Sequence, residues 1–324
     1  MNYKFLVKIV AVIITIVLLA LLVTQINLKD IFTTIININP IYLITGFILY
    51  LCSYFFRAWR FHILLNKEVS IKDLFDIGCV HNMMNNLLPA RTGELSYIYL
   101  LKTKQNKTTG EGLATLIIAR IFDFIIISTL FLLLFLFIKD LAPGFSTLIV
   151  IGVIFLFLMV ILLLGLLFFG NSILKIQRKY ADTINFKKFH LGDYITKKSE
   201  ETIQCFEKFK FGTMKMHISV ILLSIGIWML LYALFYVIAL SMDIPLEGIQ
   251  ILFAASFAVF STALPIQGIG GFGTMEGGWA LGFIAVGATK EIAINTGFGF
   301  HLIILFYTIF LGLWGYGRIY FASK

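Results

Sequence analysis

Long apolar runs alternate with short polar segments along the whole chain. Six of the runs have about the 20 residues that a helix needs to cross a bilayer: 5–23, 41–59, 112–138, 146–169, 217–240 and 292–314. Two further apolar segments, 71–101 and 246–286, are interrupted by glycine and proline. If each of these is a hairpin, the chain has six full crossings. If each is a pair of short spans, it has up to ten, and the pattern leaves both counts open.

The interruption in the second half reads LPIQGIGGFGTME over residues 264–276. A helix does not continue through so many glycine and proline residues. Irregular backbone at membrane depth survives only where it is buried in protein or lines a wet cavity. We therefore predict the elbow of a broken or re-entrant helix, with Glu276 at the start of its second arm. The expected hinge residues are Pro265, Gly268, Gly270, Gly271 and Gly273.

The interruption in the first half, NNLLPARTGE over residues 85–94, has the same order of features. Leu-Pro comes first, then Gly93, then Glu94 at the start of an apolar segment, and Pro89 and Gly93 are the expected hinges. Interrupted segments at corresponding places in two halves of a chain are typical of a transporter binding site. The pattern predicts two inverted repeats, at about 41–138 and 217–320.

Composition narrows the class of protein. Of the 324 residues, 60% are hydrophobic and only 13% are charged, against roughly 25% charged in a soluble domain. We expect one all-α polytopic membrane domain over residues 1–324. The first run, 5–23, is predicted to be a retained span, because no small-residue cleavage site follows it. The net charge of +9 does not indicate nucleic-acid binding, because the basic residues follow the positive-inside rule.

The placement of lysine and arginine predicts a multi-pass protein of the cell membrane with both termini in the cytoplasm. The opposite side has only Lys29, Lys139 and Lys290. The connector 170–216 is basic and looks helical over residues 193–211. It is interpreted either as a surface helix held by anionic lipids or as an ordinary connector. The basic residues assigned to the cytoplasmic side, besides those of this connector, are Lys4, Lys8, Arg57, Arg60, Lys67, Lys72, Lys102, Lys104, Lys107, Arg318 and Lys324.

Charged residues at membrane depth are costly and mark functional or paired positions. Arg91 is the expected primary ligand for a phosphate, because its planar guanidinium binds such oxygens bidentately. The free N–H groups of broken helices would favour the same anion. In the alternative, Arg91–Glu94 and Arg120–Asp123 are neutralising pairs that fix the elbows. The candidate head-group ligands are Arg91, Glu94, Arg120, Asp123, Glu276 and Asn86, and His301 lies inside the last span.

Other chemistry has little support in the sequence. The stretch GIGGFG at 268–273 matches G-x-G-x-x-G, but no strand precedes it, so a dinucleotide site is rejected. We find no catalytic motif and no spacing typical of metal ligands, and we expect no cofactor. No P-loop is present, so transport would be passive or ion-coupled, with a carboxylate such as Glu94 or Glu276 as the hypothetical proton carrier.

The stretch NLLPARTGE at 86–94, Arg120 with Asp123, and the path from Pro265 through Gly270 and Gly271 to Glu276 resemble the lysylphosphatidylglycerol synthase transmembrane (flippase-like, UPF0104) family. That family is similar to the flippase half of bacterial aminoacyl-phosphatidylglycerol proteins. The resemblance implies a translocating part without a synthase domain, since the chain ends just after its last apolar run.

The leading hypothesis is therefore a translocator that moves a phosphate-bearing lipid head group between leaflets, with membrane lipids as its partners. Two alternatives stay open. The first is a partner or transferase subunit that presents lipid to a separate lipid-modifying enzyme. The second is a carrier of small solutes or ions.

Overall fold

The computed structural model describes residues 36–139, 141–183, 190–263 and 268–321, and the secondary structure within these ranges is helical. Five of the helices are long and apolar enough to cross a membrane. They match five of the six predicted spans; the sixth, 5–23, lies outside the described residues. The five are α3 (Pro40–Leu64), α6 (Thr109–Phe135), α7 (Phe145–Thr183), α9 (Met214–Leu240) and α12 (Lys290–Phe321).

Local sequence sets where the long helices begin. The Asn39 side chain accepts a hydrogen bond from the backbone N–H of Ile41 at the start of α3, and Pro40 occupies the first turn, where it costs no hydrogen bond. At the start of α6, the Thr108 hydroxyl accepts from the Glu111 N–H, and the Glu111 carboxylate accepts from the Thr108 N–H. This reciprocal cap satisfies two donors that the helix itself leaves unpaired.

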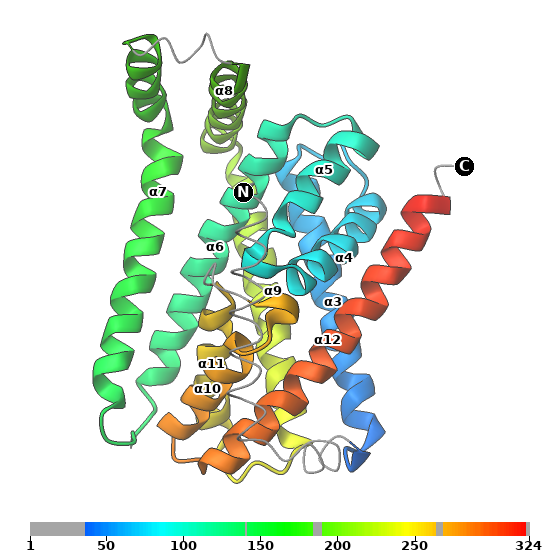
Figure 1. Cartoon of the computed structure of the whole chain (residues 1–324), viewed down its shortest axis with the longest axis vertical. Coiled ribbons are helices and arrows are strands. Elements are labelled where there is room, and N and C mark those ends of the chain that lie inside the picture. Colours follow the sequence, from blue (N-terminus) through cyan, green and yellow to red (C-terminus); the bar gives the residue numbers. More distant parts are fainter. Residues whose placement is uncertain (1–35, 140, 184–189, 264–267, 322–324) are drawn as a thin grey trace, which may run out of the picture.

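Each predicted elbow consists of two short helices joined through a 3₁₀ turn. In the first half, α4 (Ile71–Leu87) leads through η1 (Pro89–Arg91) to α5 (Glu94–Gln105). In the second half, α10 (Gly248–Ala263) and α11 (Thr274–Ala285) flank η3 (Ile269–Gly271). Figure 1 shows α4 and α5 in the upper half of the bundle and α10 and α11 in the lower half. The turn η3 contacts both η1 and α4, so the two elbows meet inside the bundle.

The two elbows use glycine for different physical reasons. In the second elbow, Gly270, Gly271 and Gly273 have φ values of 69°, 74° and 85°, a left-handed region that other residues rarely adopt. In the first elbow, Gly93 has an ordinary φ of −61°. A Cβ there would lie 2.2 Å from the backbone nitrogen of Asn85, so glycine lets α5 begin directly against α4. Pro265, an expected hinge, lies outside the described residues.

The outer surface of the bundle is apolar, as a membrane requires. The helix α7 lies at the edge of the bundle, packed against α6 and α8. Its outward residues include Phe157, Leu162 and Phe169, which are exposed. A helix that exposes this much apolar surface is stable in lipid rather than in water. The chain is thus a multi-pass helical membrane protein.

The basic connector is shorter than expected, because α7 continues to Thr183. The predicted helix is present as α8 (His190–Lys210). Its residues Ile203, Phe206 and Phe209 are buried in a cluster with side chains of α6, α7 and α9, whereas Ile195 is exposed. Protein therefore covers the apolar face of α8, and contact of its lysines with anionic lipid stays a prediction.

Basic residues gather at one end of the bundle. This end comprises the α3–α4 and α5–α6 connections, α8 and the end of α12, and we call it the basic end. The Lys107 ammonium, between α5 and α6, binds both Glu68, between α3 and α4, and Glu111. The hydrogen bond from Lys107 holds the pKa of the Glu68 carboxyl below its ordinary value. Near the end of α12, Arg318 Nε lies 3.1 Å from Asp76 Oδ2 of α4. At the opposite end lie the end of α6, which Lys139 follows, and the start of α12, whose first residue is Lys290 (Figure 1).

Candidate functional site

A buried ion pair connects α3 with α6. Arg60 Nη1 donates to Asp123 Oδ1 at 2.7 Å, and Arg60 Nη2 donates to Oδ2 at 3.3 Å. The Trp228 indole N–H of α9 also donates to Asp123 Oδ1, at 3.0 Å, and Arg60 Nη1 donates to the Ser224 hydroxyl at 2.9 Å. The two charged side chains are only 1% and 5% exposed. A bidentate, fully desolvated pair of this kind fixes three helices in one arrangement.

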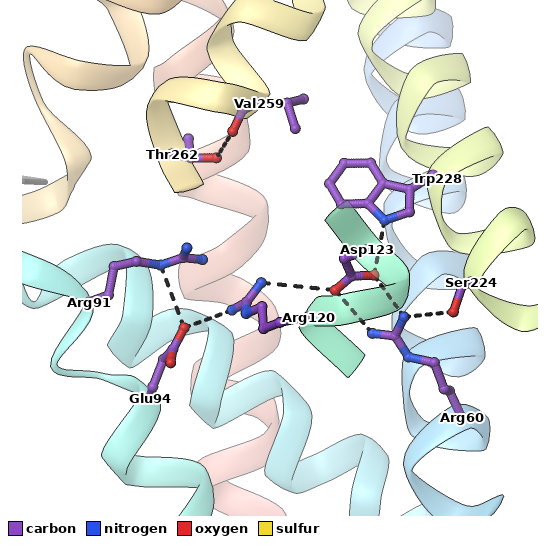
Figure 2. A network of polar contacts seen from close by, with 9 residues as sticks. All are labelled: Arg60, Arg91, Glu94, Arg120, Asp123, Ser224, Trp228, Val259 and Thr262. Carbon is purple, nitrogen blue, oxygen red and sulfur yellow. Dashed lines mark hydrogen bonds and ion pairs between the residues drawn. The ribbon is translucent and has the colours of Figure 1, made fainter. Parts of the chain in front are cut away.

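The polar contacts continue from this pair toward the first elbow. Arg120 Nη1 lies 4.0 Å from Asp123 Oδ2, and Arg120 Nη2 donates to Glu94 Oε1 at 2.9 Å. Arg91 Nε lies 3.6 Å from the same Glu94 oxygen. Figure 2 shows the resulting row, in which positive and negative side chains alternate from Arg60 to Arg91. We call these five residues the charged row.

The charged row is buried at its inner end and partly exposed over the rest of its length. Its inner pair is almost completely buried, whereas Arg120 and Glu94 are 25% and 33% exposed and Arg91 is 17% exposed. Glu94 is the first residue of α5, and Arg91 is the last residue of η1, where it has a left-handed φ of 55°. The first elbow thus places the outer charges, and the long helices α3 and α6 place the inner ones.

The charge pairing differs from the one that sequence spacing suggests. In the alternative interpretation, Arg120 and Asp123, three apart on α6, neutralise each other. Their closest distance is 4.0 Å, and each has a nearer partner on another helix. Arg60 was assigned to a connection after the second apolar run and was missed as a site residue. It lies inside α3, because the helix continues to Leu64. The available signal was a pair of arginines three apart, Arg57 and Arg60, directly after an apolar run.

Positive charge exceeds negative charge around the row. Arg57 of α3 lines the same small cavity as Arg60, Arg120 and Asp123. Together with Arg91 and Glu94, four arginines face two carboxylates in this region. The cavity itself measures about 20 Å³, which is room for about one water molecule. The space enclosed by these side chains is therefore far smaller than a lipid head group.

Glu276 forms a separate buried site in the second elbow. Its Oε1 lies 2.7 Å from His301 Nδ1 of α12, and its Oε2 accepts from the Gly273 N–H at 2.8 Å. Both side chains are at most 3% exposed, and the His301 ring packs against Phe272 at 4.7 Å between centroids. Glu276 thus caps α11 and ties it to α12, and the structure does not place it in the charged row.

Asn86, the last of the predicted ligands, forms its hydrogen bond within its own helix. Its amide nitrogen donates to the Asn82 carbonyl at 2.9 Å, one turn earlier in α4. Near it, buried Nδ1 of His81 and Oδ1 of Asn85 have no hydrogen-bond partner among the described residues. In the part of the chain that the structure describes, no group of three or more His, Cys, Asp or Glu side chains could hold a metal ion.

Comparison with known proteins agrees with the resemblance seen in the motifs. The family described as the lysylphosphatidylglycerol synthase TM region matches residues 8–312. A UPF0104 membrane protein of Methanocaldococcus jannaschii is 36% identical over 108 residues, which cover 32% of this chain and 46% of that relative. The match thus spans less than half of the relative. No solved structure matches the chain. From its motifs and from this match over almost its full length, the chain belongs to the lysylphosphatidylglycerol synthase TM region family.

Proposed function

We propose that the protein translocates lipids, moving a phosphate-bearing head group between leaflets with the outer part of the charged row as its binding site. The observation that carries the proposal is the sharing of one carboxylate by two arginines. Arg91 and Arg120 both contact Glu94 Oε1. The whole row has three arginines and two carboxylates, and Arg57 lies beside it, so arginines outnumber carboxylates in this region.

A phosphate group fits this arrangement chemically. Guanidinium groups bind phosphate oxygens through parallel N–H bonds, and arginine keeps its charge in a low-dielectric site. An incoming phosphate would bind between Arg91 and Arg120, while Glu94 keeps both side chains oriented. The inner pair, Arg60 with Asp123, is too buried to meet a ligand. In this proposal its role is to hold α3, α6 and α9 as a rigid support.

Transport on this proposal requires the two elbows to separate. The cavity at the row holds about one water in this conformation, and η3 packs directly on η1 and α4. We infer that the α4–α5 pair enters the membrane from the basic end and the α10–α11 pair from the opposite end, as inverted repeats. Movement of one pair against the other would then expose the row to each leaflet in turn.

The distribution of basic residues indicates how the protein is oriented in the membrane. Lys107, Arg318 and the lysines of α8 gather at the basic end, and positive residues favour the cytoplasmic side. The proposal therefore places the basic end, and both termini, in the cytoplasm of a cell that carries the protein in its cell membrane.

The test is transport of a labelled anionic phospholipid in reconstituted vesicles, comparing wild type with Arg91→Ala. We expect the variant to fold, because Arg91 is partly exposed, and to lose most of its transport. Arg91→Lys should retain part of the activity, since it keeps the charge but not the bidentate geometry. The matched control is Lys102→Ala, which removes an exposed charge from α5, the same half of the bundle.

Unchanged transport in Arg91→Ala would refute the role of the row. Two other results would favour the alternative functions. Lipid binding without transport, together with stable association with a lipid-modifying enzyme, would indicate a presenting subunit. Flux of a small solute without any lipid movement would indicate a carrier.

A further inference from the structure

Lysines at the basic end fall into two groups that differ in their partners. In the first group, each ammonium contacts at least one carboxylate. Lys107 contacts Glu68 and Glu111, Lys198 contacts Glu201, and Lys210 contacts Glu207. Other lysines are exposed and have no hydrogen bond or ion pair from their ammonium groups to any described residue, and three of these line one cavity. These are Lys67 in the α3–α4 turn, Lys208 in α8 and Lys215 at the start of α9.

The three unpaired lysines line one cavity, although they come from three different segments. The cavity measures about 600 Å³, about thirty times the volume enclosed at the charged row. Its polar lining also includes His62, Asn66 and Thr213, and no acidic side chain lines it. Three like charges around one hollow repel each other, so an anion in the hollow would relieve an unfavourable interaction.

Two large aromatic side chains at this cavity are exposed. Trp59 of α3 is 51% exposed and Phe211, just after α8, is 83% exposed, and both belong to the cavity lining. Aromatic residues in such positions are typical of the boundary between lipid tails and head groups. Trp59 is adjacent in sequence to the buried Arg60, but neighbouring side chains leave a helix in different directions, and the cavity lining includes no residue of the charged row.

We propose that this cavity binds the phosphate head group of an anionic phospholipid, with Lys67, Lys208 and Lys215 around the phosphate and the acyl chains along Trp59 and Phe211. A lipid fits better than a free phosphate ester, because only a lipid also covers exposed aromatic surface. The site is separate from the charged row, shares no residue with it, and does not depend on transport. It would hold an anionic lipid at the basic end of the bundle.

The test measures lipid binding by native mass spectrometry of the purified protein in detergent. The probes are phosphatidylglycerol, zwitterionic phosphatidylcholine and soluble glycerol phosphate. The variant Lys67→Gln/Lys208→Gln/Lys215→Gln empties the cavity of charge. The control, Lys102→Gln/Lys175→Gln/Lys197→Gln, removes the same charge from exposed lysines outside this cavity. Since all six side chains are exposed, we expect both variants to fold.

We expect wild type and control to bind phosphatidylglycerol with similar affinity, and the cavity variant to bind it about tenfold more weakly or worse. The same difference between cavity variant and control should persist when both also carry Arg91→Ala, because that background removes binding at the charged row and leaves only the cavity. An equal loss in both triple variants would overturn the proposal, because it would show a general surface-charge effect. Binding of glycerol phosphate as tight as that of the lipid, or of phosphatidylcholine as tight as phosphatidylglycerol, would overturn it as well.

Discussion

The buried pair of Arg60 and Asp123 allows a sharp test of how this bundle is held together. Asp123→Asn leaves the Arg60 guanidinium, which is 1% exposed, without a counter-charge. Arg60→Met leaves the Asp123 carboxylate with the Trp228 N–H and with Arg120 at 4.0 Å. Breaking a buried pair from one side costs about 3–5 kcal/mol of unfolding free energy. We expect the cost of Arg60→Met to lie at the lower end of this range, because Arg120 can move closer to the Asp123 carboxylate.

The double variant Arg60→Met/Asp123→Asn removes both charges and keeps an acceptor oxygen for Trp228. Replacing a buried ion pair by neutral groups of similar size is often close to neutral. Allowing for lost hydrogen bonds, we expect the double variant to be destabilised by only about 1–2 kcal/mol. The two single costs sum to about 6–10 kcal/mol, so the coupling energy should be about 4 kcal/mol or more.

Equilibrium unfolding in lipid bicelles gives the unfolding free energy of wild type, both single variants and the double variant. The same four proteins are compared in the transport assay. If the inner pair only supports the row, the double variant should regain both stability and much of the transport. Single variants within 1 kcal/mol of wild type, or costs that simply add, would refute the reasoning. Recovered stability without recovered transport would show instead that the Arg60 charge takes part in transport.

Two further predictions concern the first elbow and the basic end. Gly93→Ala would put a Cβ 2.2 Å from the Asn85 backbone nitrogen, so we expect a loss of about 1–3 kcal/mol in the unfolding assay. The control is Gly78→Ala in α4, where a Cβ meets nothing within 4 Å; it should leave stability unchanged or raise it slightly. Equal losses of unfolding free energy in the two variants would contradict the close contact of α5 with α4 at Gly93. Glu68, whose pKa is lowered by its hydrogen bond from Lys107, should add slight stability above about pH 4.3. This contribution to stability is lost as the pH falls through the lowered pKa of Glu68 in the folded state. Thermal melting measured at several pH values should show the loss in wild type and not in Lys107→Met.

The sequence determined the helices of this protein to a large extent. Apolar runs of bilayer length fix the position of a helix with little help from its neighbours, because backbone groups in lipid must be satisfied within the helix. Five of the predicted spans are present for this reason. Both elbows were also predictable, since proline at 89 and the glycines at 270 and 271 interrupt a helix by local sterics alone. The motif at 86–94 further identified the family correctly.

The pairing of charges was decided only by the tertiary structure. Spacing along one helix suggested Arg120 with Asp123, but contacts between helices give each a nearer partner. Sequence carries no direct information on which helix faces which. For the same reason Arg60 was taken for a connection residue, since a helix can bury a long charged side chain near its end when a carboxylate on another helix meets it.

The sequence also did not predict that the glutamates of the two elbows have different kinds of partner. Glu94 and Glu276 occupy equivalent places in two similar motifs, yet one meets two arginines and the other a histidine and a backbone N–H. The unpaired lysines of the basic end look like any others in a basic connector. Only the folding of the α3–α4 turn against the end of α8 and the start of α9 distinguishes Lys67, Lys208 and Lys215, which line one cavity. Local sterics and hydrophobicity are encoded residue by residue, whereas the neighbours of a charge depend on how the whole chain packs.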